Sequence, residues 1–374
     1  MGKATIKTHK KHASITKPSG GRFHRNEFGP LEAPCGKVQS LVRYINRSLK
    51  SDYNVGYIDA EHQAKQEDMP GMYSHYIDKI DFHQLNFHSE KDAYQYRTWF
   101  NDCHLVMVNG NHFESDQQIV FLNSKKKASL EKKLDRLTNV IAFIQDDEEV
   151  HEYLKERLPH WEEIPIFPIS EEEGLIALLN EKIKKPELKG LVLAGGKSTR
   201  MGKDKGGIDY HGTPQREHMA DLLKASCTET YISLSPDSTC ECKYPVLSDS
   251  FVGLGPFGGM LSAFKSDPNA AWLVVACDQP LLDEAHLEKL IAERDQTKLA
   301  TCFYNPETKF PEPLITIWEP RAYPILLQFL GQGYSCPRKV LINSQVKEIR
   351  LDENDFMMNV NTPEEYKGAM KRLA

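Results

Sequence analysis

Residues 188–205 read LKGLVLAGGKSTRMGKDK, and this stretch decides the fold. Its first six residues are mostly apolar and predict a buried strand, which the adjacent Gly195 and Gly196 end with a sharp turn. Backbone N–H groups in such a loop form a concave anion site, to which Arg200 and Lys205 add positive charge. The spacing is neither that of Walker A nor that of a G-x-G-x-x-G fingerprint. The stretch therefore predicts a strand followed by a triphosphate-binding loop.

Short apolar runs and amphipathic stretches alternate on both sides of this loop, which is typical of an α/β fold around a largely parallel sheet. The clearest boundary is the charged, proline-containing segment 182–189, KIKKPELK, which overlaps the start of the strand. A chain of 374 residues is long enough for two domains. We therefore expect one α/β domain over residues 1–185 and a second over residues 186–374.

Within the first domain the periodicity predicts individual elements. Apolar residues at helical spacing predict helices over residues 38–49 and 130–137. Polar residues around Pro70 and Gly71 predict a long loop over residues 61–75.

Composition excludes several classes of protein. The net charge of −6 argues against bulk nucleic-acid binding, and the longest apolar run, Ala270–Cys277, is too short to span a membrane. The N-terminus has no apolar leader, so we expect a cytoplasmic protein. Eight scattered cysteines fit reduced thiols. Residues 1–26 form a basic arm with seven Lys and Arg and no acidic residue, which is either a solvated tail or a phosphate-binding arm.

Four motifs in the second half carry a resemblance to a known family. LAGGKSTRMGKDK at residues 193–205 matches the L-A-G-G-x-S-x-R-M-G-x-D-K signature of molybdenum cofactor guanylyltransferases, the MobA-like nucleotidyltransferases. Asp249 with GLGPFGG at 253–259 resembles their D…GPLxG loop, ACDQP at 276–280 their C-D-x-P motif, and NVNTPEE at 359–365 their N-V-N-T-P-E signature. The resemblance covers nearly all of residues 188–374.

This resemblance implies a Rossmann-like domain with a mixed sheet flanked by helices, and an enzyme that transfers GMP from GTP to the phosphate of molybdopterin. Pyrophosphate is the second product, and Mg²⁺ is the implied cofactor. The residues with implied roles are catalytic Arg200, Lys205 and Asp278; nucleotide-binding Leu193, Ala194, Gly195, Gly196, Lys205, Asp249 and Asp278; molybdopterin-binding Asn359 and Asn361; and the metal ligand Asp278. Molybdoenzymes or their chaperones stay open as further partners, with neither nucleic acid nor membrane among them.

These motifs also have a physical interpretation. Asp278 follows a buried strand, where ligands bind in open α/β sheets and where a carboxylate can hold Mg²⁺. Either Asn361 or Thr362 is expected to cap the last helix. Gln215 and Arg216 replace the usual K-P-L-like run, so we expect an altered surface near the second substrate.

Alternatives remain open on the sequence alone. A cytidylyl transfer to molybdopterin or an NTP transfer to a sugar phosphate uses the same fold, although the Gly195-Gly196 pair favours guanine over the cytidylyl relatives. A third possibility is a nucleotide-binding protein whose main task is to recruit other proteins of the pathway.

The first half resembles, in pattern only, the P-loop protein called molybdopterin-guanine dinucleotide biosynthesis protein B (MobB-like). A Gly-Lys loop at Gly36-Lys37 lies between a strand and a helix, but Val38 stands where Ser or Thr would bind Mg²⁺. A later strand ends at Asn109 rather than at an acidic residue. We therefore predict a degenerate P-loop domain that does not hydrolyse NTP.

Overall fold

The computed structural model describes residues 22–61, 73–87, 93–132, 134–170, 173–195, 204–238 and 241–373. The chain divides into two compact units, an N-terminal unit over Met1–Lys184 and a C-terminal unit over Lys185–Ala374. The boundary lies one residue from the one expected. We describe each unit by itself. Along the described ranges no helix combines the length and the apolarity that a membrane crossing requires.

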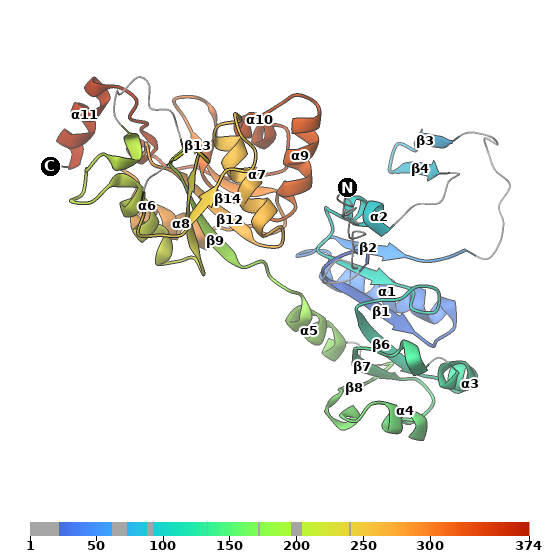
Figure 1. Ribbon diagram of the computed structural model, residues 1–374. Coiled ribbons are helices and arrows are strands. Elements are labelled where there is room, and N and C mark those ends of the chain that lie inside the picture. Colours follow the sequence, from blue (N-terminus) through green and yellow to red (C-terminus); the bar gives the residue numbers. More distant parts are fainter. Residues whose placement is uncertain are drawn as a thin grey trace, which may run out of the picture. The chain divides into compact units, whose positions relative to one another are not determined.

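The N-terminal unit is built on a six-stranded sheet in the order β2-β5-β1-β6-β7-β8, in which every neighbouring pair is parallel. Figure 1 shows this sheet with its helices. The strands are β1 (Glu27–Leu31), β2 (Val55–Ile58), β5 (Leu105–Val108), β6 (Gln117–Leu122), β7 (Val140–Gln145) and β8 (Ile166–Pro168). The helices are α1 (Cys35–Leu49), α2 (Ala93–Trp99), α3 (Lys127–Glu131), α4 (Glu152–Arg157) and α5 (Glu173–Lys182), with 3-10 turns at Ser124–Lys126, Leu134–Arg136 and Trp161–Glu163.

Helix α1 forms as its apolar spacing predicts. The five buried residues of α1 are the five apolar positions of the predicted helix, namely Val38, Leu41, Val42, Ile45 and Leu49. They pack with α5 against one face of the sheet, where Phe28, Met107, Ile119 and Ile144 are also buried. Helices α3 and α4 cover a second apolar cluster around Val120 and Phe143. Apolar burial on both faces therefore positions the strand ends that follow β1, β2 and β5.

Two predictions for this unit are wrong in part. The helix expected over residues 130–137 ends at Glu131, and a 3-10 turn follows. Side chains bind the carbonyl groups there, since Gln118 Nε2 donates to Arg136 O at 2.7 Å and Arg157 Nε donates to Leu134 O at 3.1 Å. The described end of the loop expected over residues 61–75 enters a hairpin of β3 (Ser74–Asp78) and β4 (His83–Phe87), which was not predicted.

The C-terminal unit has a seven-stranded mixed sheet in the order β11-β10-β9-β12-β14-β13-β15. Strand β14 is antiparallel to both of its neighbours, and the other pairs are parallel. The strands are β9 (Leu188–Leu193), β10 (Thr230–Leu234), β11 (Val246–Ser248), β12 (Ala271–Ala276), β13 (Ala300–Asn305), β14 (Phe310–Trp318) and β15 (Lys347–Ile349). This is the α/β class with a mixed sheet that the sequence predicts.

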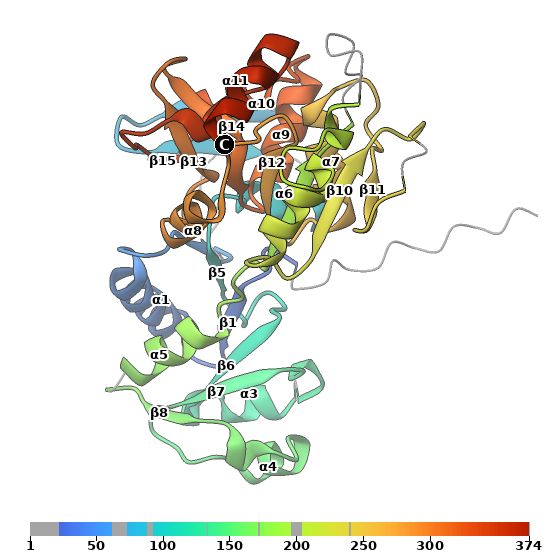
Figure 2. The same ribbon diagram turned by 90° about the vertical axis from the view of Figure 1, so that its left-hand side faces the viewer.

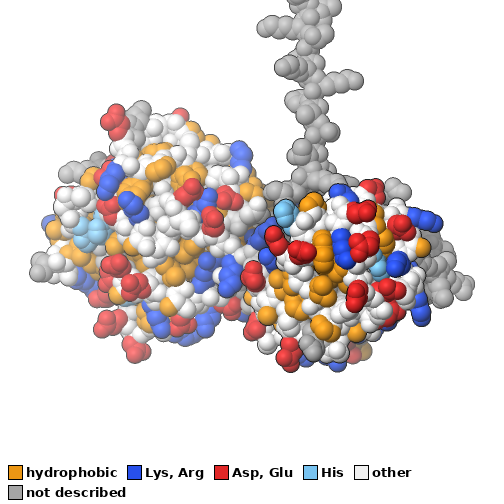
Figure 3. Space-filling view, turned by 90° about the horizontal axis from the view of Figure 1, so that it is seen from below, with side chains coloured by type: hydrophobic (Ala, Val, Ile, Leu, Met, Phe, Trp, Pro, Cys, Tyr) orange, Lys and Arg blue, Asp and Glu red, His pale blue; other side chains and the backbone are white. Residues whose placement is uncertain are grey.

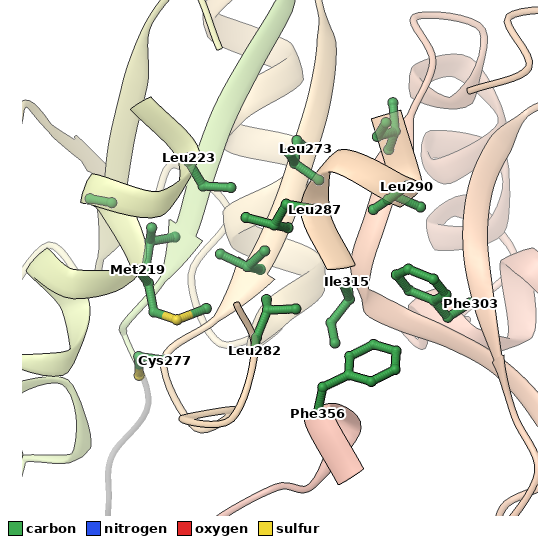
Figure 4. Close-up of a cluster of buried hydrophobic side chains, with 14 of the residues drawn as sticks. Met219, Leu223, Leu273, Cys277, Leu282, Leu287, Leu290, Phe303, Ile315 and Phe356 are labelled. Atoms are coloured by element: carbon green, nitrogen blue, oxygen red, sulfur yellow. The ribbon is translucent and has the colours of Figure 1, made fainter. Parts of the chain in front are cut away.

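Helices cover both faces of this sheet (Figures 1 and 2). The helices of this unit are α6 (Gln215–Lys224), α7 (Pro256–Ser266), α8 (Glu284–Ala292), α9 (Ala322–Gly331), α10 (Pro337–Ile342) and α11 (Pro363–Leu373), with 3-10 turns at Lys205–Gly207 and Asp355–Met357. Helices α6 and α8 pack on one face, and Figure 4 shows Met219 and Leu223 from α6 pointing toward Leu287 from α8 and Leu273 from β12. Helices α7, α9 and α10 cover the other face.

Acidic and basic side chains are interspersed on the face of the molecule seen in Figure 3. The net charge of −6 is therefore not gathered into a single acidic field on that face.

Candidate functional site

A pocket in the C-terminal unit opens where β9, β10 and β12 end. Its lining residues are Leu193, Ala194, Gly195, Lys205, Ser233, Asp249, Gly255, Pro256, Ala276, Cys277, Asp278 and Leu314. The carboxyl ends of parallel strands lie at one edge of a sheet, which is where ligands bind in open α/β folds. The structure thus brings together every described residue for which the sequence predicts nucleotide binding.

Three of the four motifs meet at Lys205. Its Nζ donates a hydrogen bond to Asn361 Oδ1 and lies 3.8 Å from Asp278 Oδ2. The backbone of the last motif is tied to the same place, because Val360 N donates to Asp278 O at 2.7 Å. Lys205 is therefore held between a carboxylate and an amide that come from distant parts of the chain.

The last motif also settles which residue caps α11. Glu365 Oε2 accepts from the backbone N–H groups of Asn361 and Thr362, at 2.6 and 2.9 Å, while Glu365 N donates to Thr362 Oγ1 at 3.3 Å. This reciprocal arrangement is a capping box with Thr362 as the cap. The side chain of Asn361 is thereby left for Lys205.

Asp249 lies in the pocket on the side of β10. Ser233 Oγ donates to its Oδ1 at 2.7 Å. Burial raises the pKa of Asp249, and the hydrogen bond from Ser233 offsets that effect only in part. A half-buried carboxylate that has one protein donor can accept further hydrogen bonds from a hydroxyl or amino group of a ligand.

Helix α7 begins at this pocket. Gly255, with φ of +57°, takes a backbone conformation that side chains disfavour, and Pro256 occupies the first turn. Both residues line the pocket. The start of an eleven-residue helix presents partial positive charge and N–H groups, so it suits a phosphate or other anion.

The expectation of an altered surface at Gln215 and Arg216 is wrong, because both side chains are buried. Arg216 Nη2 pairs with Asp204 Oδ2, and the Arg216 side chain lies directly against Gly206 and Gly207. Asp204 Oδ1 in turn accepts from Gly206 N at 3.2 Å. Arg216 therefore holds the turn that carries Lys205 in place through Asp204. In the sequence, Arg216 stood out only as a departure from the K-P-L-like run of the resembled family.

The donor set fits the predicted Mg²⁺. Asp278 Oδ1 is buried and has no hydrogen-bond partner among the described residues. Burial raises the pKa of Asp278, while the nearby charge of Lys205 lowers it, and burial prevails. Mg²⁺ in nucleotide sites needs only one or two protein carboxylates because phosphates and water supply the other ligands.

A second buried carboxyl, which the sequence analysis missed, lies on the neighbouring strand. Glu312 of β14 is buried, and its Oε2 lies 3.6 Å from Arg338 Nη2. Burial raises the pKa of Glu312, and the backbone N–H of Leu314 and the charge of Arg338 offset that effect only in part. The available signal was an acidic residue at the start of an otherwise apolar strand.

Some predicted site residues are not tested by this geometry. Gly196 and Arg200 lie outside the described residues. Asn359 is exposed and does not line the described pocket. Their assigned roles, like the roles of the residues that do meet, stay predictions.

Comparisons with known proteins agree with this placement. A family profile described as MobA-like NTP transferase domain matches residues 190–348, so this part of the chain is a nucleotidyltransferase domain. The molybdenum cofactor biosynthesis bifunctional protein of Synechocystis sp. is 37% identical over 187 residues, which are 49% of this chain and 54% of that protein. The chain therefore spans about half the length of that relative.

Other relatives match over almost their whole length. The probable molybdenum cofactor guanylyltransferase of Carboxydothermus hydrogenoformans is 31% identical over 48% of this chain and 93% of its own length. The molybdenum cofactor guanylyltransferase of Shewanella sediminis is 30% identical over 50% of this chain and 98% of its own length. A solved structure, molybdopterin-guanine dinucleotide biosynthesis protein A from Archaeoglobus fulgidus, is 22% identical with a TM-score of 0.43, over 49% of this chain and 97% of that one. Through its C-terminal half, the chain belongs to the molybdenum cofactor guanylyltransferase family.

Proposed function

We propose that the C-terminal unit transfers GMP from GTP to the terminal phosphate of molybdopterin and releases pyrophosphate. One observation carries this proposal: Lys205 and Asp278 line one pocket on the carboxyl edge of the sheet, and Asn361, from a third motif, accepts a hydrogen bond from Lys205. The pocket combines a cation, a carboxylate and the start of a helix. Such groups suit a nucleoside triphosphate, because they can stabilise the charge that develops on its oxygens during phosphoryl transfer.

The residues divide the work between binding and charge stabilisation. An oxygen of the molybdopterin phosphate forms a bond to the α-phosphorus of GTP, and the bond from that phosphorus to the pyrophosphate oxygen breaks. Lys205 neutralises negative charge on the phosphates, and the backbone of Leu193–Gly195 together with the start of α7 surrounds the nucleotide. Asp249 accepts a hydrogen bond from the ribose or the base. The protein forms no covalent bond to the substrate in this scheme.

Asp278 would hold Mg²⁺ through its Oδ1, which has no hydrogen-bond partner in the part of the chain that the structure describes. When bound, the ion supplies neutralisation of the triphosphate charge. The raised pKa of Asp278 supports this role, because a cation would offset the burial that disfavours its charged form.

Calorimetric titration with GTP and Mg²⁺, followed by turnover with molybdopterin, tests the proposal. We expect saturable GTP binding and release of pyrophosphate, both of which Lys205→Met weakens strongly. Lys224→Met, which removes an exposed lysine from the end of α6, is the matched control and should behave as the parent chain. Preference for CTP in a parallel titration would move the assignment to a cytidylyltransferase. GTP binding without turnover would favour a recruiting protein.

For the N-terminal unit we propose no NTP hydrolysis. Val38 is a buried residue of α1, and the Asn109 side chain donates to Asp59 Oδ1 at 2.7 Å. Neither residue offers the Mg²⁺ ligand that a P-loop protein has there. The basic arm lies almost wholly outside the described residues. Its role stays a prediction, as do the cytoplasmic location and the molybdoenzymes or chaperones as partners.

A further inference from the structure

A cysteine, a histidine and an aspartate meet in the N-terminal unit, at the carboxyl ends of three adjacent parallel strands. Cys35 follows β1, His112 follows β5, and Asp59 follows β2. Cys35 Sγ lies 3.7 Å from His112 Nε2, and the same nitrogen lies 4.0 Å from Asp59 Oδ1. A thiol, an imidazole and a carboxylate in contact are the groups from which proteins build nucleophilic cysteine sites.

The backbone around these side chains is held in place by two buried or half-buried amides. Asn111 bridges to the loop before α1, since its Oδ1 accepts from Glu32 N at 2.8 Å and its Nδ2 donates to Ala33 O at 2.9 Å. Asn109 Oδ1 accepts from Asn111 N at 3.1 Å. The loop that carries His112 and the loop that carries Cys35 are therefore cross-linked by hydrogen bonds next to the thiol.

The charge of Asp59 is stabilised locally. Burial raises the pKa of this carboxyl, but hydrogen bonds from Gln39, Tyr57, Ala60 and Asn109 outweigh burial and leave the pKa below its ordinary value. A carboxylate that stays ionised near His112 favours the imidazolium that forms when His112 takes a proton.

Cys35 is also the first residue of α1, a helix of fifteen residues. The thiol therefore lies at the end of the helix where the backbone N–H groups of the first turn are found. By contrast Lys37, the cation of the degenerate loop, is bonded to Asp146 at 2.5 and 2.6 Å. Lys37 is thus paired with the carboxylate that follows β7, whereas Cys35 of the same loop lies beside His112.

We propose that Cys35 is a nucleophilic thiol, that His112 is its base, and that the substrate class is small disulfides. In the step, the Cys35 proton passes to His112 Nε2 and Sγ attacks one sulfur of the disulfide. A new S–S bond forms at Cys35, the original S–S bond breaks, and the leaving thiolate takes up a proton. Cys35 is thereby converted into a reversible mixed disulfide, and a second thiol restores it.

The test compares two cysteines of the full-length chain. The protein reacts at pH 7 with 2,2′-dithiodipyridine or glutathione disulfide, and peptide mass mapping gives the rate at each cysteine. Cys336 is more exposed than Cys35 and serves as the internal reference. We expect Cys35 to react at least about tenfold faster than Cys336, which is a modest demand on general-base assistance.

Two variants separate activation from simple access. His112→Gln should lower the Cys35 rate to that of Cys336 or below, and Asp59→Asn, which keeps the shape of the side chain, should slow it severalfold. Far-UV circular dichroism verifies that each variant is folded, and the Cys336 rate should not change. Cys35 reacting no faster than Cys336, or an unchanged Cys35 rate in folded His112→Gln or Asp59→Asn protein, overturns the proposal.

Discussion

Gly258, in the first turn of α7, has no room for a side chain. A Cβ at this position would lie 2.2 Å from the backbone oxygen of Phe251, whereas real Cβ contacts below 3.0 Å are essentially absent from proteins. Gly258→Ala must therefore separate α7 from the Phe251 backbone by the difference, about 0.8 Å. Both sides of this contact are backbone-bound, so a rotamer change cannot relieve it. Overpacking of this kind costs about 1–3 kcal/mol of stability.

The displacement falls on the pocket at the ends of β9, β10 and β12. Gly255 and Pro256 at the start of α7 line that pocket, and Asp249 lies two residues before Phe251. A shift of about 1 Å at a reacting site can lower a rate by as much as about a hundredfold. We therefore expect Gly258→Ala to reduce kcat/KM for GMP transfer by about ten- to a hundredfold, with a lower urea midpoint.

The matched control is Gly331→Ala, at the end of α9 in the same unit, where a Cβ would meet nothing within 4 Å. It should keep full activity and gain up to about 1 kcal/mol from helix propensity. Pyrophosphate release at several GTP concentrations gives kcat/KM, and urea unfolding gives stability. Parent-like activity and stability of Gly258→Ala would refute the packing argument.

Three further predictions concern charged groups. Asp278→Asn should lower turnover at least about a hundredfold yet stabilise the unit at pH 7, because burial raises the pKa of Asp278 and its ionised form is costly in the folded state. This gain in stability should vanish as the pH falls below the ordinary aspartate pKa, because the Asp278 carboxyl is then neutral in both the folded and the unfolded state. A stability gain in urea that persists at that pH contradicts the raised pKa of Asp278. Arg216→Leu should lower kcat about tenfold with little change in KM, since Lys205 loses its support, and Arg216→Lys should restore part of it; equal kcat for all three proteins argues against positioning. Lys37→Ala should leave GMP transfer within about twofold but lower the urea midpoint of the N-terminal unit, because Asp146, whose side chain is 7% exposed, loses its cation; a large fall in transfer would show that this loop serves the reaction.

The elements that were predicted correctly are those whose burial is visible locally. The strand Leu188–Leu193 was expected with the observed bounds, because a mostly apolar run forms a central strand. The edge strands Val246–Ser248 and Lys347–Ile349 were missed, since three residues carry too short a pattern and their partners lie elsewhere in the chain.

The candidate site divides in the same way. The sequence motifs predicted Lys205 and Asp278 as site residues. The hydrogen bond between Lys205 and Asn361 could not be predicted, because only tertiary folding brings these residues together. The Arg216 pair with Asp204 and the burial of Glu312 depend on how α6 and β14 pack, which local periodicity does not report. The contact between Cys35 and His112 likewise depends on tertiary folding, because the two residues lie on separate loops that are far apart in the sequence.

The hydrogen bond between Lys205 and Asn361 joins residues that are 156 positions apart. A ribosome that adds about 5–20 residues per second needs roughly 8–30 s to extend the chain from one to the other. During that interval residues 188–205 have been made, but the amide that holds the Lys205 side chain has not. The pocket that Lys205 lines therefore stays incomplete in the nascent chain until synthesis has passed Asn361.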